Sequence, residues 1–174
     1  MGVNVYLARH AEAEPGHSIP DSHRSLTGVG RRRARVVGQI LLQRPEIIDT
    51  VWTSPLVRAV QTSEIFSGAL GIDKVAAHQT IVAPPDLNHI IDLIVDSSAQ
   101  IQGLMVVGHQ PTLGLLISLL LQREYARPLS PGTVVALNVD RDRRTARFRW
   151  SRSTFSATTV PGDSGRAYSR CSRR

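Results

Sequence analysis

Four residues of this chain, Arg9, His10, Arg58 and His109, have the side chains that phosphoryl transfer requires. The planar guanidinium group of arginine forms paired, charge-assisted hydrogen bonds with phosphoryl oxygens. A neutral histidine can be a nucleophile, and a protonated histidine can donate a hydrogen bond to phosphate. One histidine can therefore attack phosphorus while the other histidine and the arginines hold the equatorial oxygens. This scheme needs no metal ion and no cofactor.

Each of these residues follows a segment that has the composition of a strand. The segments are residues 3–8 before Arg9 and His10, residues 50–53 before Ser54 and Arg58, and residues 104–107 before His109. In open α/β sheets, ligands bind at the carboxyl ends of the strands. If these strands are parallel neighbours, all four side chains converge on one edge of the sheet.

Helices are expected between the strands. Thr27 is the predicted N-cap of a helix of about four turns that Pro45 closes. Its candidate apolar stripe consists of Val29, Val36, Val37, Ile40 and Leu41. Ser54 and Pro55 predict the N-cap and first residue of a second helix, which places Arg58 in its first turn, where the helix dipole favours an anion. This helix is expected to reach about Leu70 and to stop at Gly71.

The rest of the chain continues the alternation. The pattern predicts a weak strand at 74–77, helices at 86–98 and from about 110 to 121, and a hairpin of strands 134–139 and 146–150. This order predicts an α/β fold, a three-layer α/β/α sandwich around a mostly parallel sheet. Hydrophobic residues make up 41% of the chain and aromatic residues only 5%, a composition that suits such a buried sheet. One catalytic domain is expected over residues 1–155, followed by a flexible tail rich in Ser and Arg at 156–174.

The chain is basic, with a formal net charge of +7 that comes almost entirely from arginine, since Lys74 is the only lysine. Such a charge favours anionic ligands. The run Arg31–Arg35 and the arginines of residues 141–174 are interpreted as a solvated helix face and a loose tail. Nucleic-acid binding is disfavoured, because no aromatic stacking surface or recognised module accompanies the charge.

Other classes of site and location are also disfavoured. Cys171 is the only cysteine, so no intramolecular disulfide forms, and His10-Ala11-Glu12 lacks the partners of a known metal motif. The longest apolar run, residues 113–121, is far shorter than the roughly 20 residues that span a bilayer. No leader pattern precedes the first strand. These observations predict a soluble, cytoplasmic protein.

A lone histidine at a strand end is more often structural than catalytic, so the interpretation depends on three motifs taken together. They read Arg9-His10-Ala11, Thr53-Ser-Pro-Leu-Val-Arg-Ala-Val-Gln-Thr62 and Val106-Val-Gly-His-Gln-Pro111. In order and spacing they resemble the motifs of the histidine phosphatase superfamily, whose fold is phosphoglycerate-mutase-like. The resemblance covers roughly residues 3–152. The short length and the segments 9–13 and 21–27 resemble the branch of SixA-type phosphohistidine phosphatases.

The resemblance implies specific roles. His10 would be the nucleophile, Arg9, Arg58 and His109 would bind the phosphoryl group, and Arg24 would contribute more weakly at the pocket mouth. Ala11 departs from the glycine that usually follows the histidine, and we expect the turn to tolerate it. Mutase-like members usually carry a glutamate that protonates the leaving group; Asp86 and Glu12 are the candidates here.

A site without a strong acid suits a substrate whose leaving group departs easily, which favours phosphohistidine in a protein over an alkyl phosphate. The short connections also predict an open, shallow pocket that a protein surface can enter. Two alternatives remain open: a phosphatase of small phosphorylated metabolites (a sugar phosphate, nucleotide or cofactor precursor), and a non-catalytic module that only recognises phosphate.

Overall fold

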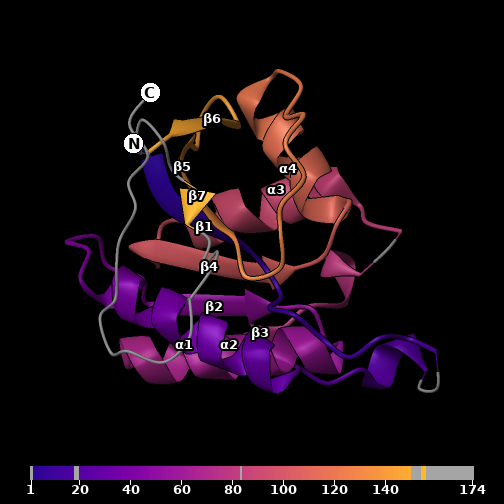
Figure 1. Ribbon diagram of the computed structural model, residues 1–174. Coiled ribbons are helices and arrows are strands. Elements are labelled where there is room, and N and C mark those ends of the chain that lie inside the picture. Colours follow the sequence, from indigo (N-terminus) through magenta and orange to yellow (C-terminus); the bar gives the residue numbers. More distant parts are fainter. Residues whose placement is uncertain (1, 18–19, 83, 150–153, 156–174) are drawn as a thin grey trace, which may run out of the picture.

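The structure, a computed structural model, describes residues 2–17, 20–82, 84–149 and 154–155 (Figure 1). Within these residues seven strands form one sheet in the order β3-β2-β4-β1-β5-β6, with β7 paired to β5. The strands are β1 (Gly2–Arg9), β2 (Thr50–Thr53), β3 (Val75–Ala77), β4 (Gly103–Gly108), β5 (Val134–Asp140), β6 (Thr145–Phe148) and β7 (Thr154–Phe155). The helices are α1 (Gly28–Leu42), α2 (Val57–Leu70), α3 (Leu87–Ser97) and α4 (Thr112–Leu121), with short 3-10 turns η1 (Asp21–His23) and η2 (Gln79–Ile81).

Helices cover both faces of the sheet, α1 and α2 on one side and α3 and α4 on the other (Figure 1). Side chains along the central strands alternate between these two layers, as the two-residue period of a strand requires. In β1, Val5 and Leu7 join the core under α3 and α4, whereas Tyr6 and Ala8 join the core under α1 and α2. The predicted three-layer sandwich is confirmed.

The strands β1, β4, β2 and β3 run parallel, and β5 is antiparallel to β1. The pairing register places Arg9 opposite Gly108, and Thr53 opposite Val107. The carboxyl ends of the three strands that precede the candidate residues therefore lie level at one edge of the sheet. The mostly parallel character was predicted correctly, as was the hairpin of β5 and β6.

Helix α1 begins where the sequence predicts it. The Thr27 hydroxyl accepts a hydrogen bond from the backbone N–H of Gly30 at 2.9 Å. The predicted apolar stripe is wrong in part, because Val29 is exposed and Val36 and Ile40 are only half-buried. The buried face consists of Gly30, Ala34, Val37, Gly38 and Leu41.

Small residues on this face allow α1 and α2 to approach closely. A Cβ added at Gly38 would lie 2.8 Å from the Cβ of Ala69, so only glycine fits there without a shift. The predicted end at Pro45 comes slightly late, since the helix ends at Leu42 with Gln43 as its C-cap.

Helix α2 ends as predicted, with Gly71 in the left-handed conformation at φ 67°. Its predicted N-cap is wrong. The cap is Leu56, which makes no side-chain capping bond, and the first helical residue is Val57. The Ser54 hydroxyl instead contacts His109 and accepts a hydrogen bond from the N–H of Leu56. Arg58 still lies in the first turn of the helix.

The remaining elements agree with their predicted positions to within a few residues. Helix α3 starts at Leu87, where the Asp86 carboxylate accepts a hydrogen bond from the backbone N–H of His89 at 3.0 Å. Strand β6 ends at Phe148. Trp150 of the predicted last strand and the predicted tail at 156–174 lie outside the described residues.

Candidate active site

The loops that follow β1, β2 and β4 are tied together by backbone hydrogen bonds at the carboxyl edge of the sheet. The N–H of His10 donates to the carbonyl oxygen of Gly108 at 3.0 Å, and the N–H of Ser54 donates to that of Val107 at 2.9 Å. The rings of His10 and His109 lie with their centroids 5.0 Å apart. The structure therefore brings together the strand-end residues that the sequence singled out.

His10 is held as a neutral ring with one free nitrogen. Its Nδ1 lies 2.7 Å from the carbonyl oxygen of Ala11, and because a carbonyl can only accept, Nδ1 carries the hydrogen. The lone pair is then on Nε2. Burial, together with the nearby charges of Arg58, Arg9 and Arg24, lowers the pKa of His10 to about 4, although the bond to Ala11 opposes this. At neutral pH His10 is thus unprotonated, and its Nε2 lone pair is available.

Arg9 and Arg58 approach the site with part of their donor capacity unused. Nη1 of Arg9 donates to the carbonyl oxygen of Leu129 at 2.5 Å. Nη1 and Nη2 of Arg58 donate to the carbonyl and carboxylate oxygens of Asp21 at 2.5 and 2.9 Å. The Nε atoms of both arginines are buried and have no hydrogen-bond partner among the described residues. Burial is the main cause that lowers the pKa of Arg9, and repulsion from Arg58 is a smaller one. A bound anion would stabilise the positive charge of Arg9 against both effects.

His109 is also neutral. Its Nε2 lies 2.7 Å from Oγ of Ser54, and its Nδ1 is buried without a hydrogen-bond partner among the described residues. Burial, with repulsion from His10 and Arg58 as further causes, lowers the pKa of His109 to about 3. The protonated form of histidine, which can donate to phosphate, is therefore not the form of His109 in the free protein. A neutral imidazole still has one N–H to donate.

The turn that carries His10 rests on polar groups that the sequence analysis missed. The N–H of Ala11 donates to the Thr62 hydroxyl at 3.1 Å, and that hydroxyl donates to the carbonyl oxygen of Arg58 at 2.7 Å. Thr62 lies four residues after Arg58, one turn along the same buried face of α2, which is the signal that could have found it. The turn around Arg9-His10 is thereby fastened to α2.

Gly132 closes the other side of this turn. Its N–H contacts the carbonyl oxygens of His10 and Arg9 at 3.0 and 3.2 Å, and its φ of 77° is one that glycine adopts without strain. Ala11 is fully buried, and it is not among the described residues that have a positive φ. Alanine therefore replaces glycine after the histidine without forcing a left-handed backbone.

Arg24 lies beside the site but is engaged elsewhere. Its Nε donates to the carbonyl oxygen of Glu14 at 2.6 Å, and its Nη1 donates to the Asp21 carboxylate at 2.9 Å. Asp21, which the sequence analysis did not single out, thus bridges Arg24 and Arg58. Hydrogen bonds from these two arginines lower the pKa of Asp21. An acidic residue three positions before Arg24, in the loop after the first strand, was the available signal.

The two candidate proton donors are bound to other parts of the molecule. Asp86 caps α3. Glu12 accepts a hydrogen bond from the Thr27 hydroxyl at 2.9 Å and forms an ion pair with Arg33 at 3.3 Å. The Asp21 carboxylate, by contrast, forms an ion pair with Arg58.

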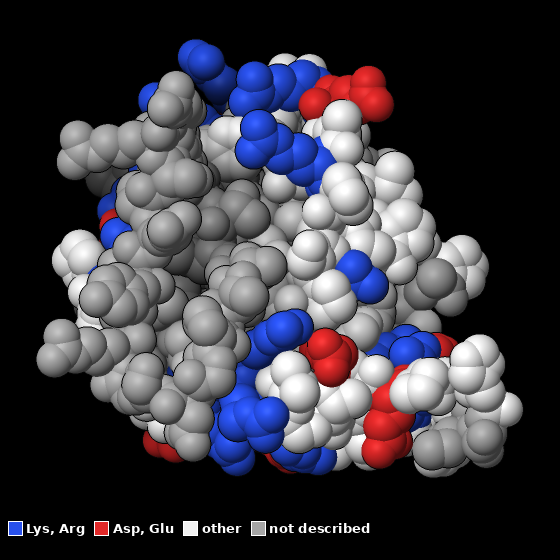
Figure 2. All heavy atoms as spheres, in the orientation of Figure 1, with Lys and Arg blue, Asp and Glu red and all other residues white. Residues whose placement is uncertain are grey.

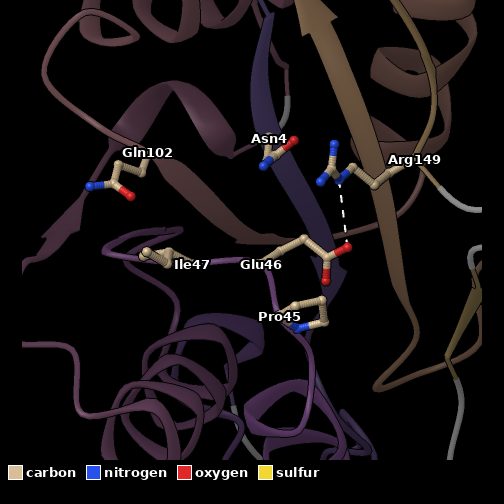
Figure 3. A pocket seen from close by; sticks show the side chains of 6 residues that line it. All are labelled: Asn4, Pro45, Glu46, Ile47, Gln102 and Arg149. Carbon is tan, nitrogen blue, oxygen red and sulfur yellow. Dashed lines mark ion pairs between the residues drawn. The ribbon is translucent and has the colours of Figure 1, made fainter.

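A separate hollow of about 290 Å³ lies at the opposite end of the sheet (Figure 3). Its lining includes Asn4, near the start of β1, and the ion pair of Arg149 with Glu46 at 3.7 Å. Asn4 lies six positions before His10, which follows the end of β1, so about 20 Å of extended chain separates them. This hollow is therefore distinct from the histidine site.

In the described part of the chain, no group of three or more His, Cys, Asp or Glu side chains is arranged to hold a metal ion. Over the same residues, none of the helices has the length and apolar character needed to cross a membrane.

The fold places a pair of neutral histidines and two arginines at the carboxyl edge of the sheet of an α/β protein. A model of the histidine phosphatase superfamily (branch 1) matches residues 5–80, which include Arg9, His10 and Arg58 but not His109. An uncharacterized protein of Picosynechococcus sp. (strain PCC 7002) is 32% identical over 114 residues, 64% of this chain and 69% of that protein. The chain belongs to the histidine phosphatase superfamily, and this membership supports a phosphatase activity.

Solved structures share the fold. The protein histidine phosphatase SixA complexed with tungstate superposes with a TM-score of 0.80 at 22% sequence identity, covering 88% of this chain and 97% of that chain. A mycobacterial glucosyl-3-phosphoglycerate phosphatase superposes with a TM-score of 0.69 at 14% identity, covering 86% and 98%. The predicted phosphoglycerate-mutase-like fold is confirmed. Phosphatases named for a protein substrate and for a small metabolite both adopt it.

Proposed function

We propose that this chain is a metal-independent phosphatase that forms a phosphoenzyme on His10, and that its substrate is phosphohistidine in a protein. One observation carries the proposal. The Ala11 carbonyl holds Nδ1–H of His10, which leaves the Nε2 lone pair free beside two arginines with unpartnered buried nitrogens. A nucleophile and a receptor for anionic oxygens thus meet at one edge of the sheet.

The reaction has two displacements. In the first, Nε2 of His10 forms a bond to phosphorus while the bond to the leaving nitrogen breaks, and the substrate ring, already protonated on its other nitrogen, leaves as neutral imidazole with the electron pair. In the second, water attacks the phosphoryl group on His10, the bond between phosphorus and Nε2 breaks with its electron pair returning to Nε2, a proton of the water is lost to solvent, and inorganic phosphate departs. Arg9, Arg58 and His109 stabilise the phosphoryl oxygens in both transition states.

The carboxylates of the site support phosphohistidine as the substrate. An alkoxide is a poor leaving group unless a general acid protonates it. Arg24 and Arg58 lower the pKa of Asp21, which keeps this carboxyl ionised, and Asp86 and Glu12 are engaged elsewhere. A ring protonated on its other nitrogen departs from phosphorus as neutral imidazole without a general acid, and an ionised carboxylate nearby favours that protonated ring.

Trapping the phosphoenzyme tests this proposal. The chain is mixed with a histidine-phosphorylated protein carrying labelled phosphate, quenched in alkali and mapped by peptide. We expect the label on His10, none in His10→Ala, and unchanged labelling in His89→Ala, a matched change at an exposed histidine on α3. Labelling and turnover that persist in EDTA are expected, whereas metal-dependent turnover would contradict the scheme.

A parallel panel of phosphomonoesters separates the alternatives. Strong preference for a sugar phosphate or nucleotide over the phosphohistidine protein would favour a small-molecule phosphatase. Phosphate binding without label, and with no loss of turnover in His10→Ala, would favour a recognition module. On the face drawn in Figure 2 the described Lys and Arg side chains form separate groups, with white and red residues between some of them. A salt titration that shows no appreciable affinity for RNA or DNA would exclude nucleic-acid binding.

A further inference from the structure

Ser54 and His109 form a buried polar pair that the proposed mechanism leaves unexplained. Ser54 is completely buried at the end of β2, and its Oγ lies 2.7 Å from Nε2 of His109. The same Oγ accepts a hydrogen bond from the backbone N–H of Leu56 at 3.3 Å. The other ring nitrogen of His109, Nδ1, is buried and has no partner among the described residues.

The hydrogen on the Ser54 hydroxyl decides how this pair is arranged. The hydroxyl already accepts from Leu56, and its own hydrogen needs an acceptor, because a buried donor without one is costly. Nε2 of His109 is an acceptor at ideal distance. With Ser54 donating to Nε2, the hydrogen of the neutral imidazole has to be on Nδ1.

We propose that Ser54 is a positioning residue that fixes His109 in the tautomer with hydrogen on Nδ1, so that neutral His109 donates from Nδ1 to the phosphoryl group. The inference rests on the proposed phosphatase function for its consequence but not for its geometry. The reverse tautomer would leave the Ser54 hydrogen without this acceptor. It would also turn a lone pair of His109 toward the anionic oxygens instead of a donor.

The two histidines carry their hydrogen on Nδ1 but expose different ring nitrogens, because their hydrogen-bond partners differ. A carbonyl oxygen, which can only accept, keeps hydrogen on Nδ1 of His10 and frees Nε2 to attack. A hydroxyl, which can donate, occupies Nε2 of His109 and frees Nδ1–H to bind oxygen. Both rings remain neutral, in keeping with the lowered pKa of each. No positive histidine is then required between two arginines.

The tautomer can be measured directly by NMR on the chain labelled with ¹⁵N-histidine. Near neutral pH we expect His109 to show a protonated Nδ1 and an unprotonated Nε2. In Ser54→Ala the ring loses its donor, and we expect a mixture of tautomers. Ser63→Ala is the matched control, because Ser63 is equally buried and its hydroxyl only donates to the carbonyl oxygen of Ala59 within α2.

The kinetic consequence is measured as the rate of phosphoenzyme formation. Ser54→Ala should slow this rate by about 10- to 100-fold, which is what loss of a buried partner corresponds to. Ser54→Thr, which keeps the hydroxyl, should recover tautomer and rate together, and Ser63→Ala should leave both unchanged.

An Nε2–H tautomer in the unmodified chain would overturn the inference, as would a Ser54→Ala variant with unaltered tautomer and rate. Absence of phosphoenzyme in the unmodified chain would instead overturn the proposed function. The tautomer measurement is independent of turnover, so the two failures are distinguishable even if Ser54→Ala folds poorly.

Discussion

Because His10 is buried beside three arginines, we expect it to stay neutral, and hence nucleophilic, well into the acid range. Its pKa is lowered from 6.5 to about 4. At about pH 5.5 an ordinary histidine is roughly 90% protonated, whereas a group with a pKa near 4 is only about 3% protonated. The rate of phosphoenzyme formation should therefore hold down to about pH 5 and fall only below it.

The measurement is an NMR titration of the His10 ring, assigned by the loss of its resonances in His10→Gln, together with the pH dependence of phosphoenzyme formation. Burial is the largest cause of the low pKa, and the charge of Arg58 is a smaller one. Arg58→Gln should therefore raise the midpoint but leave it below 6.5. Lys74→Gln, which removes an exposed charge at the edge strand β3, should not move it.

The same shift affects stability. Between about pH 6.5 and 4 the unfolded chain binds a proton at His10 and the folded chain does not, so the free energy of unfolding decreases as the pH falls. The difference reaches about 3 kcal/mol for His10 alone. Urea titrations of the unmodified chain and His10→Gln at several pH values should differ by this slope. A His10 midpoint near 6.5 would refute the reasoning about burial.

Three other predictions concern the supports of the site. Thr62→Val leaves the N–H of Ala11 unpaired and should lower the free energy of unfolding by about 1–3 kcal/mol in denaturant titrations, and slow phosphoenzyme formation more than Ser63→Ala does. Asp21→Asn removes a negative charge from Arg58 and should tighten binding of inorganic phosphate by up to about fivefold in calorimetry, since the Asp21 carboxylate is largely exposed and such a partner is worth at most about 1 kcal/mol. Gly132→Ala forces an L-residue to φ 77° and should destabilise by about 1–2 kcal/mol in thermal unfolding, with no steric clash to confuse the result.

Much of the site geometry could be predicted from the sequence because it depends on strand ends. The apolar runs at residues 3–8, 50–53 and 104–107 needed only to be parallel neighbours for their following residues to meet. Pairing of β1 and β2 with β4 satisfies that condition. Parallel strands buried on both faces have near-continuous apolar sequences, which makes them easy to recognise.

The errors came from contacts between residues that are far apart in the sequence. Ser54 before Pro55 has the pattern of a helix cap, but its hydroxyl binds His109, which is 55 residues away and invisible to local pattern. The buried face of α1 was misjudged because close packing against α2 selects glycine and alanine, which carry little hydrophobic signal. In both cases tertiary contacts override the local sequence preference.

The charge state of His109 could not be decided from the sequence, for a related reason. From the sequence alone, a histidine beside a phosphate group can be either neutral or positively charged. In the folded chain it is buried next to two guanidinium groups and a second histidine, and these lower its pKa to about 3. Only the three-dimensional arrangement reveals how much positive charge is already present.

The position of Asp21 connects this charge to the choice of substrate. Its carboxylate partly neutralises Arg58 and Arg24, and its side chain is largely exposed. The alkoxide that leaves a phosphomonoester adds negative charge beside this carboxylate when the bond breaks. A phosphohistidine ring that is protonated on its other nitrogen leaves as neutral imidazole, and the carboxylate favours that protonated ring. Asp21→Asn should therefore lower the preference for phosphohistidine over a phosphomonoester. An unchanged ratio of the two turnover rates would show that Asp21 does not contribute to the choice of substrate.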